Sequence, residues 1–377
     1  MSTIIHSARL VDGEIVDDAW VCFDGDGSVS RTGTGEGWQG LIADTIVDAD
    51  GGYLTPGFID MHGHGGAGVS YDDGPEAVLR ARAMHRHHGT TRAVISLVTA
   101  PLRDLAARAA MVAELTERHP DILGSHLEGP FLDPGHRGAH DERLLTEPAP
   151  DVVARLLEAG RGTVRQVTLA PELPGALAAI GRIVDAGAAA AIGHTSADFA
   201  TAGAAFDAGA TILTHAFNAM TGLHHREPGP VGAATADDRV TLEVIADGVH
   251  LHPEIVRLAF AAAPGRIALV TDAMAAAGSA DGRYRLGSLE VDVIDGVARL
   301  ADGGAIAGST LTQDAALRTA VAAGVPLEAA VDALTRAPAR TIGRDDLGSL
   351  GPGHRADAVL LSPSLRVDRV WCDGVAC

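Results

Sequence analysis

The chain has 377 residues, 46% of them hydrophobic and only 3% aromatic, which is enough for one large domain with a smaller one beside it. Its formal net charge is −20, so we expect no binding to nucleic acid or to anionic membranes. All 29 basic residues are arginine, and the absence of lysine excludes Schiff-base chemistry, a lysine-dependent phosphate loop and a carbamylated lysine that bridges two metals.

Residues 1–54 have the pattern of short strands rather than helices. Apolar and polar residues alternate, and Asp-Gly pairs that favour tight turns recur, as at Asp12-Gly13 and Asp24-Gly25. The sequence therefore predicts a small β unit here. The N-terminus has neither a basic start nor a long apolar run, so we expect no signal peptide and a cytoplasmic location.

From residue 55 onward, strands and helices alternate along the chain. Eight apolar runs of strand length are separated by segments of helical pattern, such as residues 102–119. Eight such units predict a TIM-type (β/α)8 barrel, in which functional groups lie at the carboxyl ends of the strands. No apolar run approaches the roughly 20 residues that span a bilayer, so we expect no membrane segment.

The alternation of strands and helices is interrupted at residues 279–305, where the sequence predicts a β-hairpin with a turn at Asp295-Gly296. Helices are predicted again at residues 311–324 and 326–343. The tail is β-like and could rejoin the N-terminal unit. None of the three cysteines, Cys22, Cys372 and Cys377, belongs to a CxxC pair, so we expect packed or free thiols in a reducing compartment.

Polar side chains follow five of the predicted barrel strands. Because the carboxyl ends of the strands meet at one rim of a barrel, we expect these side chains to converge on one metal ion or a pair of ions. They are His62 and His64 after LTPGFID, Glu128 in SHLEGPF, His194 after AAAAIG, His215 after ATILT, and Asp272 after RIALV.

One carboxylate and two imidazoles, from Glu128, His194 and His215, are a suitable ligand set for zinc or ferrous iron with a position left for water. His62 and His64 are two residues apart on a strand end, so both side chains point to the same side. A lone HxH pair is more often structural. Here, it suits a second ion, with Glu128 able to bridge the two.

Asp272 has two interpretations. Asp after a strand often caps the next helix, but beside a metal-activated water it would suit a general base that returns its proton to the leaving group. The loops offer further polar residues, and Arg226, His250 and the backbone N–H groups near Ala219 could together bind an anion such as phosphate. By contrast, His85, His87 and His88 lie on a predicted helix, where surface placement without a role is expected.

Several motifs in order resemble a known family. PGFIDMHGHGG, HLEGPF, GAHD, IGHT, THAFNAM, REPG, ADGVH, VTDAM and AGST together resemble the N-acetylglucosamine-6-phosphate deacetylases of the amidohydrolase superfamily, over residues 5 to 375. HLEGPF and HAFNAM at these intervals are specific, whereas PGFID and HxH mark only the superfamily. The resemblance implies a barrel at residues 55–345 and a small β-sandwich domain formed by residues 1–54 and 346–377.

The resemblance also implies a reaction, which is removal of acetate from N-acetylglucosamine 6-phosphate to give glucosamine 6-phosphate in amino-sugar catabolism and recycling. By the family pattern, Glu128, His194 and His215 match the main metal ligands, and Asp272 matches the catalytic acid/base. His140 matches a residue that contacts the acetamido carbonyl. The residues that match sugar-phosphate contacts are Asn218, Ala219, Arg226 and His250.

In this family, the equivalents of Arg226 and His250 can reach the phosphate from the neighbouring subunit, which implies a homodimer with shared active sites. Members with Gln and Asn at the HxH position use one metal, so His62 and His64 favour two. Zinc is the expected metal, with iron, manganese or cobalt as alternatives.

Other functions remain open at this point. The nearest is deacetylation of another N-acetylhexosamine phosphate, such as N-acetylgalactosamine 6-phosphate, since one hydroxyl orientation is not visible in motifs. Another is an amidohydrolase acting on a cyclic amide or a nucleobase, although HLEGPF argues against deaminases. A non-catalytic sugar-phosphate-binding regulator would lack metal ligands or Asp272, and this chain has both.

Overall fold

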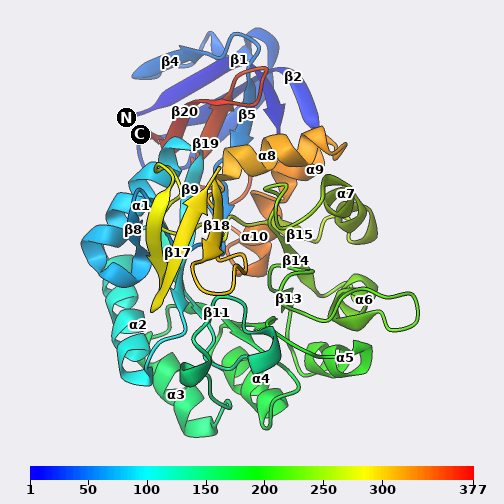
Figure 1. Ribbon diagram of the computed structural model, residues 1–377. Coiled ribbons are helices and arrows are strands. Elements are labelled where there is room, and N and C mark those ends of the chain that lie inside the picture. The colour runs from blue at the N-terminus through cyan, green and yellow to red at the C-terminus, as the bar shows by residue number, and fades with distance from the viewer.

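A computed structural model describes residues 1–377 (Figure 1). At its centre lies a sheet of eight parallel strands whose order in space follows their order along the chain. This arrangement confirms the predicted TIM-type barrel. Each strand is mostly apolar because both of its faces are covered. The strands are β6 (Phe58–Asp60), β9 (Thr90–Val98), β10 (Ile122–Glu128), β11 (Val164–Leu169), β12 (Ala189–Ile192), β13 (Ile212–Leu213), β14 (Thr241–Val244) and β15 (Ile267–Leu269).

The first and last barrel strands, β6 and β15, are joined by a side chain. The buried amide of Gln313 donates to the carbonyl of Ile59 at 2.9 Å and to that of Leu269 at 3.3 Å. Beyond the strand ends, the Asp272 N–H donates to the His62 carbonyl at 2.8 Å. The barrel is therefore nearly closed, with Gln313 bridging its seam.

Helices surround the barrel strands (Figure 1). In α2, Leu105, Ala109 and Val112 recur at helical spacing and are buried against the sheet. Helix α6 was not expected from the sequence, because its residues GPVGAATA are small and mostly apolar and show no amphipathic period. The helices are α1 (Pro75–His87), α2 (Leu102–Thr116), α3 (Pro150–Ala159), α4 (Ala176–Asp185), α5 (Phe199–Asp207), α6 (Gly229–Ala236), α7 (Pro253–Ala262) and α8 (Gln313–Ala322).

The helix predicted at residues 326–343 is two helices, α9 (Leu327–Asp332) and α10 (Arg336–Thr341). The break between them leaves two carbonyls free to pair with the barrel seam. Leu334 O accepts from the N–H of Ile59, and Ala333 O accepts from the N–H of Leu269, both at 2.8 Å. In a continuous helix the carbonyl of Ala333 would be used internally, but that of Leu334 would not, because the residue four positions on is Pro338, which has no N–H. Pro338 and the barrel seam therefore both favour the break.

The insertion at residues 279–305 is an antiparallel sheet of three strands, β16 (Gly282–Leu286), β17 (Leu289–Ile294) and β18 (Val297–Leu300). The predicted turn at Asp295-Gly296 joins β17 to β18. Side chains such as Leu286 and Val291 are buried against Met274 and Val98, close to the carboxyl ends of the barrel strands. The insertion therefore covers part of that rim.

Both ends of the chain contribute to a second sheet, which packs against the barrel (Figure 1). Strand β5 pairs with β19 antiparallel, so the tail rejoins the N-terminal unit as predicted, consistent with the small β-sandwich. Phe23, Leu54 and Trp371 are buried together in this unit. Its strands are β1 (Thr3–Val11), β2 (Ile15–Phe23), β3 (Val29–Thr34), β4 (Thr45–Asp48), β5 (Tyr53–Pro56), β19 (Ala358–Leu361), β20 (Val367–Cys372) and β21 (Val375–Ala376).

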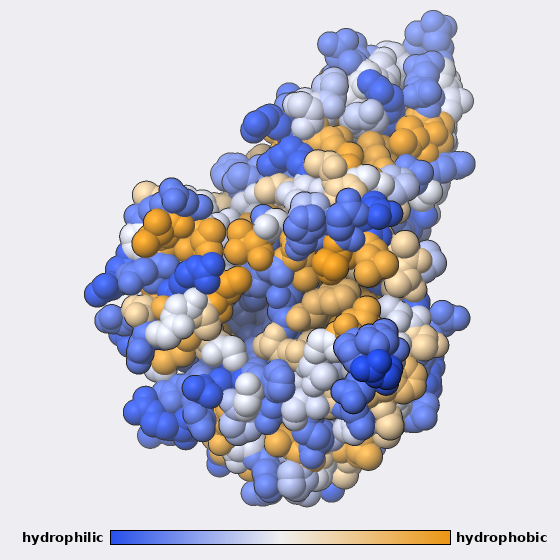
Figure 2. All heavy atoms as spheres, turned by 45° about the vertical axis from the view of Figure 1, so that its right-hand side comes forward, coloured by the Kyte–Doolittle hydropathy of each residue, from blue (hydrophilic) through white to orange (hydrophobic).

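The surface is mixed in polarity, and the face turned to the viewer in Figure 2 has a hollow at its centre with hydrophilic residues at the base and hydrophobic residues along its border. A concave site with polar groups at its base is typical of enzymes that bind small molecules. None of the helices has the length and apolar character that crossing a membrane requires.

Candidate active site

Six of the predicted site residues form one buried cluster at the carboxyl ends of the barrel strands. Five strands supply them, so the fold brings together residues more than 200 positions apart. They are His62 and His64 after β6, Glu128 at the end of β10, His194 after β12, His215 after β13, and Asp272 after β15.

Glu128 lies at the centre of the first ligand group. Its Oε1 atom is 3.1 Å from Nε2 of His194 and 3.2 Å from Nε2 of His215. The two Nε2 atoms are 3.0 Å apart. These three residues could hold a metal ion, because each points one ligand atom at the same small volume.

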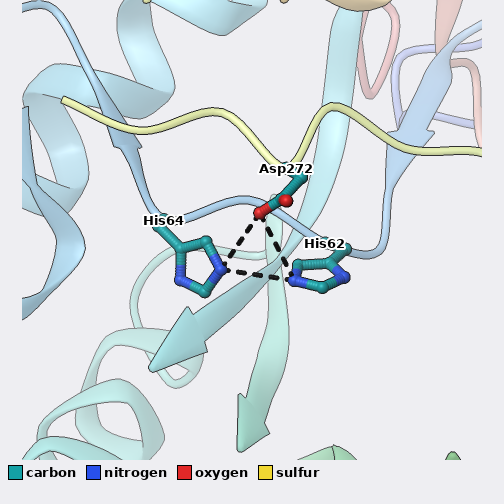
Figure 3. Close-up of side chains that lie close together, drawn as sticks. All are labelled: His62, His64 and Asp272. Carbon is teal, nitrogen blue, oxygen red and sulfur yellow. Dashed lines mark hydrogen bonds and ion pairs between the residues drawn. The ribbon is translucent and has the colours of Figure 1, made fainter. Parts of the chain in front are cut away.

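The second group consists of His62, His64 and Asp272, whose side chains point toward one another in Figure 3. The Nε2 atoms of the two histidines are 3.2 Å apart, and Oδ1 of Asp272 lies 3.6 Å from that of His62 and 3.3 Å from that of His64. Glu128 lies between the groups, since its Oε2 is 3.0 Å from Nε2 of His64. The arrangement could therefore hold one ion or two, with Glu128 shared.

The hydrogen bonds around the histidines fit a cation. Nδ1 of His194 lies 2.9 Å from the carbonyl of His136, and Nδ1 of His62 lies 2.9 Å from Oε2 of Glu243. Both acceptors require a proton on Nδ1, which leaves the Nε2 lone pairs of the neutral rings pointing into the cluster. Lone pairs converging at about 3 Å repel one another unless a cation lies among them.

Burial and charge act in opposite directions on the acidic groups. Although burial alone would raise the pKa of Asp272, the neighbouring His62 and His64 lower it to about 2. Burial would likewise raise the pKa of Glu128, but His62 and His140 outweigh this effect and hold the pKa well below its usual value. Burial opposes protonation of His64, but Asp272 and Glu128 raise its pKa to about 9. The two ionised carboxylates are thus stabilised by nearby positive charge, which metal ions would supply in place of the protons on the histidines.

Three residues of the cluster also have unusual backbone conformations. His194, His215 and Asp272 have φ angles of +49°, +26° and +47°, in the left-handed region that non-glycine residues seldom occupy. Each such residue costs on the order of 1 kcal/mol or more, and residues of this kind cluster at functional sites. The sharp turn after each strand directs these side chains into the barrel mouth.

Two buried residues beneath the cluster were missed in the sequence analysis. Glu243, within β14, accepts from Nδ1 of His62 at 2.9 Å, from Nε2 of Gln166 at 2.8 Å and from the N–H of His215 at 3.2 Å. His126, within β10, packs edge-on to His62 with ring centroids 4.6 Å apart. A charged or imidazole group inside an otherwise apolar strand, as in VTLEVIA, was the available signal.

A cavity of about 350 Å³ opens above the cluster and includes most of the predicted loop residues. His140 is buried, with Nδ1 2.8 Å from Oγ1 of Thr99 and Nε2 3.4 Å from Oε2 of Glu128. Asn218, Ala219 and His250 also line the cavity. The structure thus places four of the five expected loop residues around the metal-ligand cluster.

Arg226 does not line this cavity within a single chain. It lies on an exposed loop, where its Nη1 is 2.8 Å from Nε2 of His225. Of the groups expected to bind an anion together, His250 and the backbone near Ala219 therefore lie at the cavity of one chain, and Arg226 does not.

The expectation of surface placement is wrong for His85. His85 lies on α1, and its buried side chain faces the segment that follows His64, with Nε2 2.9 Å from the carbonyl of Gly65. Burial lowers the pKa of His85 to about 4, so the ring is neutral and donates to this carbonyl. His85 thereby supports the turn that follows His64, whereas His87 is exposed.

A family model described as the amidohydrolase family matches residues 53–377, which include the whole cluster. This chain belongs to the amidohydrolase family. It is 43% identical over 362 residues to the N-acetylgalactosamine-6-phosphate deacetylase of Escherichia coli O157:H7, covering 90% of this chain and 96% of that protein. It is 36% identical over 366 residues to the N-acetylglucosamine-6-phosphate deacetylase of Vibrio furnissii, covering 95% and 90%.

Solved structures of amidohydrolases agree with this assignment. A mutant of the N-acetyl-D-glucosamine-6-phosphate deacetylase of Mycobacterium smegmatis, in complex with N-acetyl-D-glucosamine-6-phosphate, is 43% identical with a TM-score of 0.94, covering 100% of this chain and 99% of that one. The enzyme of the same name from Thermotoga maritima has a TM-score of 0.89 at 30% identity, covering 99% of each chain. The resemblance expected from the motifs is confirmed.

Proposed function

We propose that this amidohydrolase removes acetate from N-acetyl-D-glucosamine 6-phosphate and releases D-glucosamine 6-phosphate. The observation that supports this most directly is the cluster of two ligand groups that share Glu128, with Asp272 at the base of the same cavity. Relatives named for this activity resemble the chain over nearly its full length.

The two groups would hold one or two divalent metal ions, and we expect zinc, with iron, manganese or cobalt as alternatives. His62, His64, Glu128, His194 and His215 are the proposed ligands. When bound, such an ion supplies Lewis-acid polarisation of the amide carbonyl and a water whose pKa is lowered to about 7.

Asp272 would act as the catalytic acid/base. Its carboxylate faces the cavity, and positive charge at His62 and His64 outweighs burial and lowers its pKa to about 2; a metal ion held by these residues would supply the same positive charge. It would accept a proton from the attacking water and then deliver it to the departing amine, so one group serves both steps.

His140 would position the acetamido carbonyl. Its Nδ1 is held by Thr99, whose hydroxyl also contacts the backbone carbonyl of Glu128 at 3.1 Å. The ring is thereby fixed with Nε2 toward the cavity, where it would contact the acetamido carbonyl oxygen and orient it.

The phosphate would be bound at the outer part of the cavity by His250, Asn218 and the backbone N–H of Ala219. Burial would lower the pKa of His250, but Asp247, 2.6 Å from its Nδ1, raises it and so favours the imidazolium form that attracts an anion. Arg226 would complete the phosphate site of a partner subunit in a homodimer, because its side chain is exposed and does not line the cavity of its own chain.

The test is acetate release by the purified, metal-loaded protein, with N-acetylglucosamine 6-phosphate and unphosphorylated N-acetylglucosamine supplied in parallel. Rapid release from the phosphate and slow release from the free sugar would support both the reaction and the anion contacts. Absence of release from either substrate, with metal shown to be bound, would overturn the proposal.

N-acetylgalactosamine 6-phosphate is the second candidate substrate, because a relative named for it is 43% identical to this chain. The two sugars differ only in the orientation of one hydroxyl, so the same catalytic groups would serve both. Comparing kcat/KM for the two phosphates separates them, and a higher value for the galactosamine isomer would reverse our preference.

A further inference from the structure

A second polar pocket, of about 480 Å³, lies at the amino-terminal end of the barrel. Its lining comes from the starts of β9, β10 and β11 and from the segment that connects α10 to the small sheet. The catalytic cluster follows the opposite ends of these strands. Because the seven residues of β10 span about 20 Å, the pocket is separate from the active site.

Four arginines and a single carboxylate, Asp346, line this pocket. Two further carboxylates, Asp357 and Asp373, contact these arginines, so the pocket keeps one uncompensated positive charge in a chain whose net charge is −20. The four are Arg92, Arg165, Arg344 and Arg355.

Three of these arginines have carboxylate partners. Nε and Nη2 of Arg344 each lie 2.7 Å from an oxygen of Asp346, in a bidentate pair. The buried Arg92 contacts Asp357, and Arg355 contacts Asp373. These pairs hold the guanidinium groups in place around the pocket.

Arg165 is the exception, because no carboxylate lies within ion-pair distance of it. Its one hydrogen bond runs from Nε to the carbonyl of Leu123 at 2.8 Å, which leaves both terminal nitrogens of the guanidinium without a partner. Burial and the like charge of Arg344 lower the pKa of Arg165. An anion between Arg165 and Arg344 would remove this unfavourable interaction.

We propose that this pocket binds a small phosphate-bearing anion through Arg165 and Arg344. A phosphate has three oxygens that can accept from several guanidinium groups at once. The pocket is larger than inorganic phosphate requires and lies within the range of small-molecule sites, so a phosphorylated metabolite fits the space. The lining joins barrel strands to the segment leading into the small sheet, so the ligand would also link the two units.

Calorimetric titration of the metal-loaded protein with inorganic phosphate tests the site, with Arg165→Gln as the variant and Arg161→Gln as the matched control. Arg161 lies four residues away on the surface and contacts only Glu114. Phosphate can also bind at the active site, so the wild type should show two binding events per chain, of which only one depends on Arg165. We expect the affinity of that event to fall at least about tenfold in Arg165→Gln and to be unchanged in Arg161→Gln.

Arg165→Lys retains the charge and should keep part of the affinity, which provides a test even if Arg165→Gln does not fold. Identical isotherms for the wild type and either Arg165 variant would overturn the proposal. Glucosamine 6-phosphate and citrate are titrated in parallel. Tighter binding of the sugar phosphate at the Arg165-dependent site supports a phosphorylated metabolite, whereas tighter binding of citrate overturns the choice of phosphate.

Discussion

A single buried carboxylate, that of Glu243, connects two of the proposed metal ligands. It accepts a hydrogen bond from the ring of His62 and another from the backbone of His215, and Gln166 occupies its remaining oxygen. Such carboxylate–histidine pairs fix the tautomer and orientation of a metal ligand. The geometry of the cluster therefore depends on a residue that does not line the cavity.

We predict that Glu243→Gln weakens metal binding. The amide has a similar shape but lacks the charge that stabilises the Nδ1 proton of His62, so metal affinity should fall about 10- to 100-fold. Titration with zinc in competition with a chromophoric chelator measures the change. Glu254→Gln is the control, because Glu254 is exposed and contacts only Arg257 nearby. An unchanged zinc affinity in Glu243→Gln would contradict this role.

Asp272→Asn should have a different effect. The amide keeps the shape of the side chain but cannot take up the proton of water, so we expect kcat to fall at least about 100-fold while substrate still binds. Acetate release measures kcat, and calorimetry with the substrate measures binding. Turnover close to that of the wild type would remove Asp272 from its proposed role as the acid/base.

At the scale of elements, the barrel seam determines how the chain after β15 folds. The amide of Gln313, at the start of α8, donates to carbonyls of β6 and β15. The two carbonyls between α9 and α10 accept from backbone N–H groups of the same two strands. Because His62 and Asp272 follow these same two strands, the seam also sets the distance between two members of the second ligand group.

We predict that Gln313→Leu lowers the melting temperature. Leucine fills a similar volume but leaves the carbonyls of Ile59 and Leu269 and the hydroxyl of Thr90 without this partner. An unsatisfied buried polar group costs about 1–3 kcal/mol. Scanning calorimetry measures the shift, with the exposed Gln39→Leu as control. Equal melting temperatures for Gln313→Leu and the wild type would show that the seam is held by other contacts.

At the scale of the whole molecule, one chain does not assemble a complete phosphate site around its own active-site cavity. That cavity has histidines but no arginine, while Arg226 lies on an exposed loop. In the homodimer that we propose, this loop would bring a guanidinium group to the cavity of the partner, where it would add positive charge for an anionic substrate in a chain of net charge −20.

Arg226→Ala should therefore raise KM and leave kcat nearly unchanged, because the phosphate contact is equally strong in the ground and transition states. Steady-state kinetics with N-acetylglucosamine 6-phosphate measure both constants, and light scattering shows whether the variant keeps the oligomeric state of the wild type. Arg239→Ala is the control, since Arg239 is also exposed but pairs with Asp237 and Asp207. A KM equal to that of the wild type would exclude Arg226 from the phosphate site.

The barrel and its ligand cluster follow from local sequence, whereas the groups that support the cluster follow only from tertiary contacts. Each ligand comes directly after an apolar run, and parallel barrel strands necessarily bring those ends to one rim. Glu243 and the buried His85 gain their roles from residues far away in the chain, at His62 and Gly65. The break between α9 and α10 has both origins, because Pro338 disfavours a continuous helix and the barrel seam pairs with the two carbonyls at the break. The pattern of apolar residues in a strand predicts which face is buried. The hydrogen-bond partners of a polar side chain depend on residues far away in the chain, so only the tertiary structure determines them.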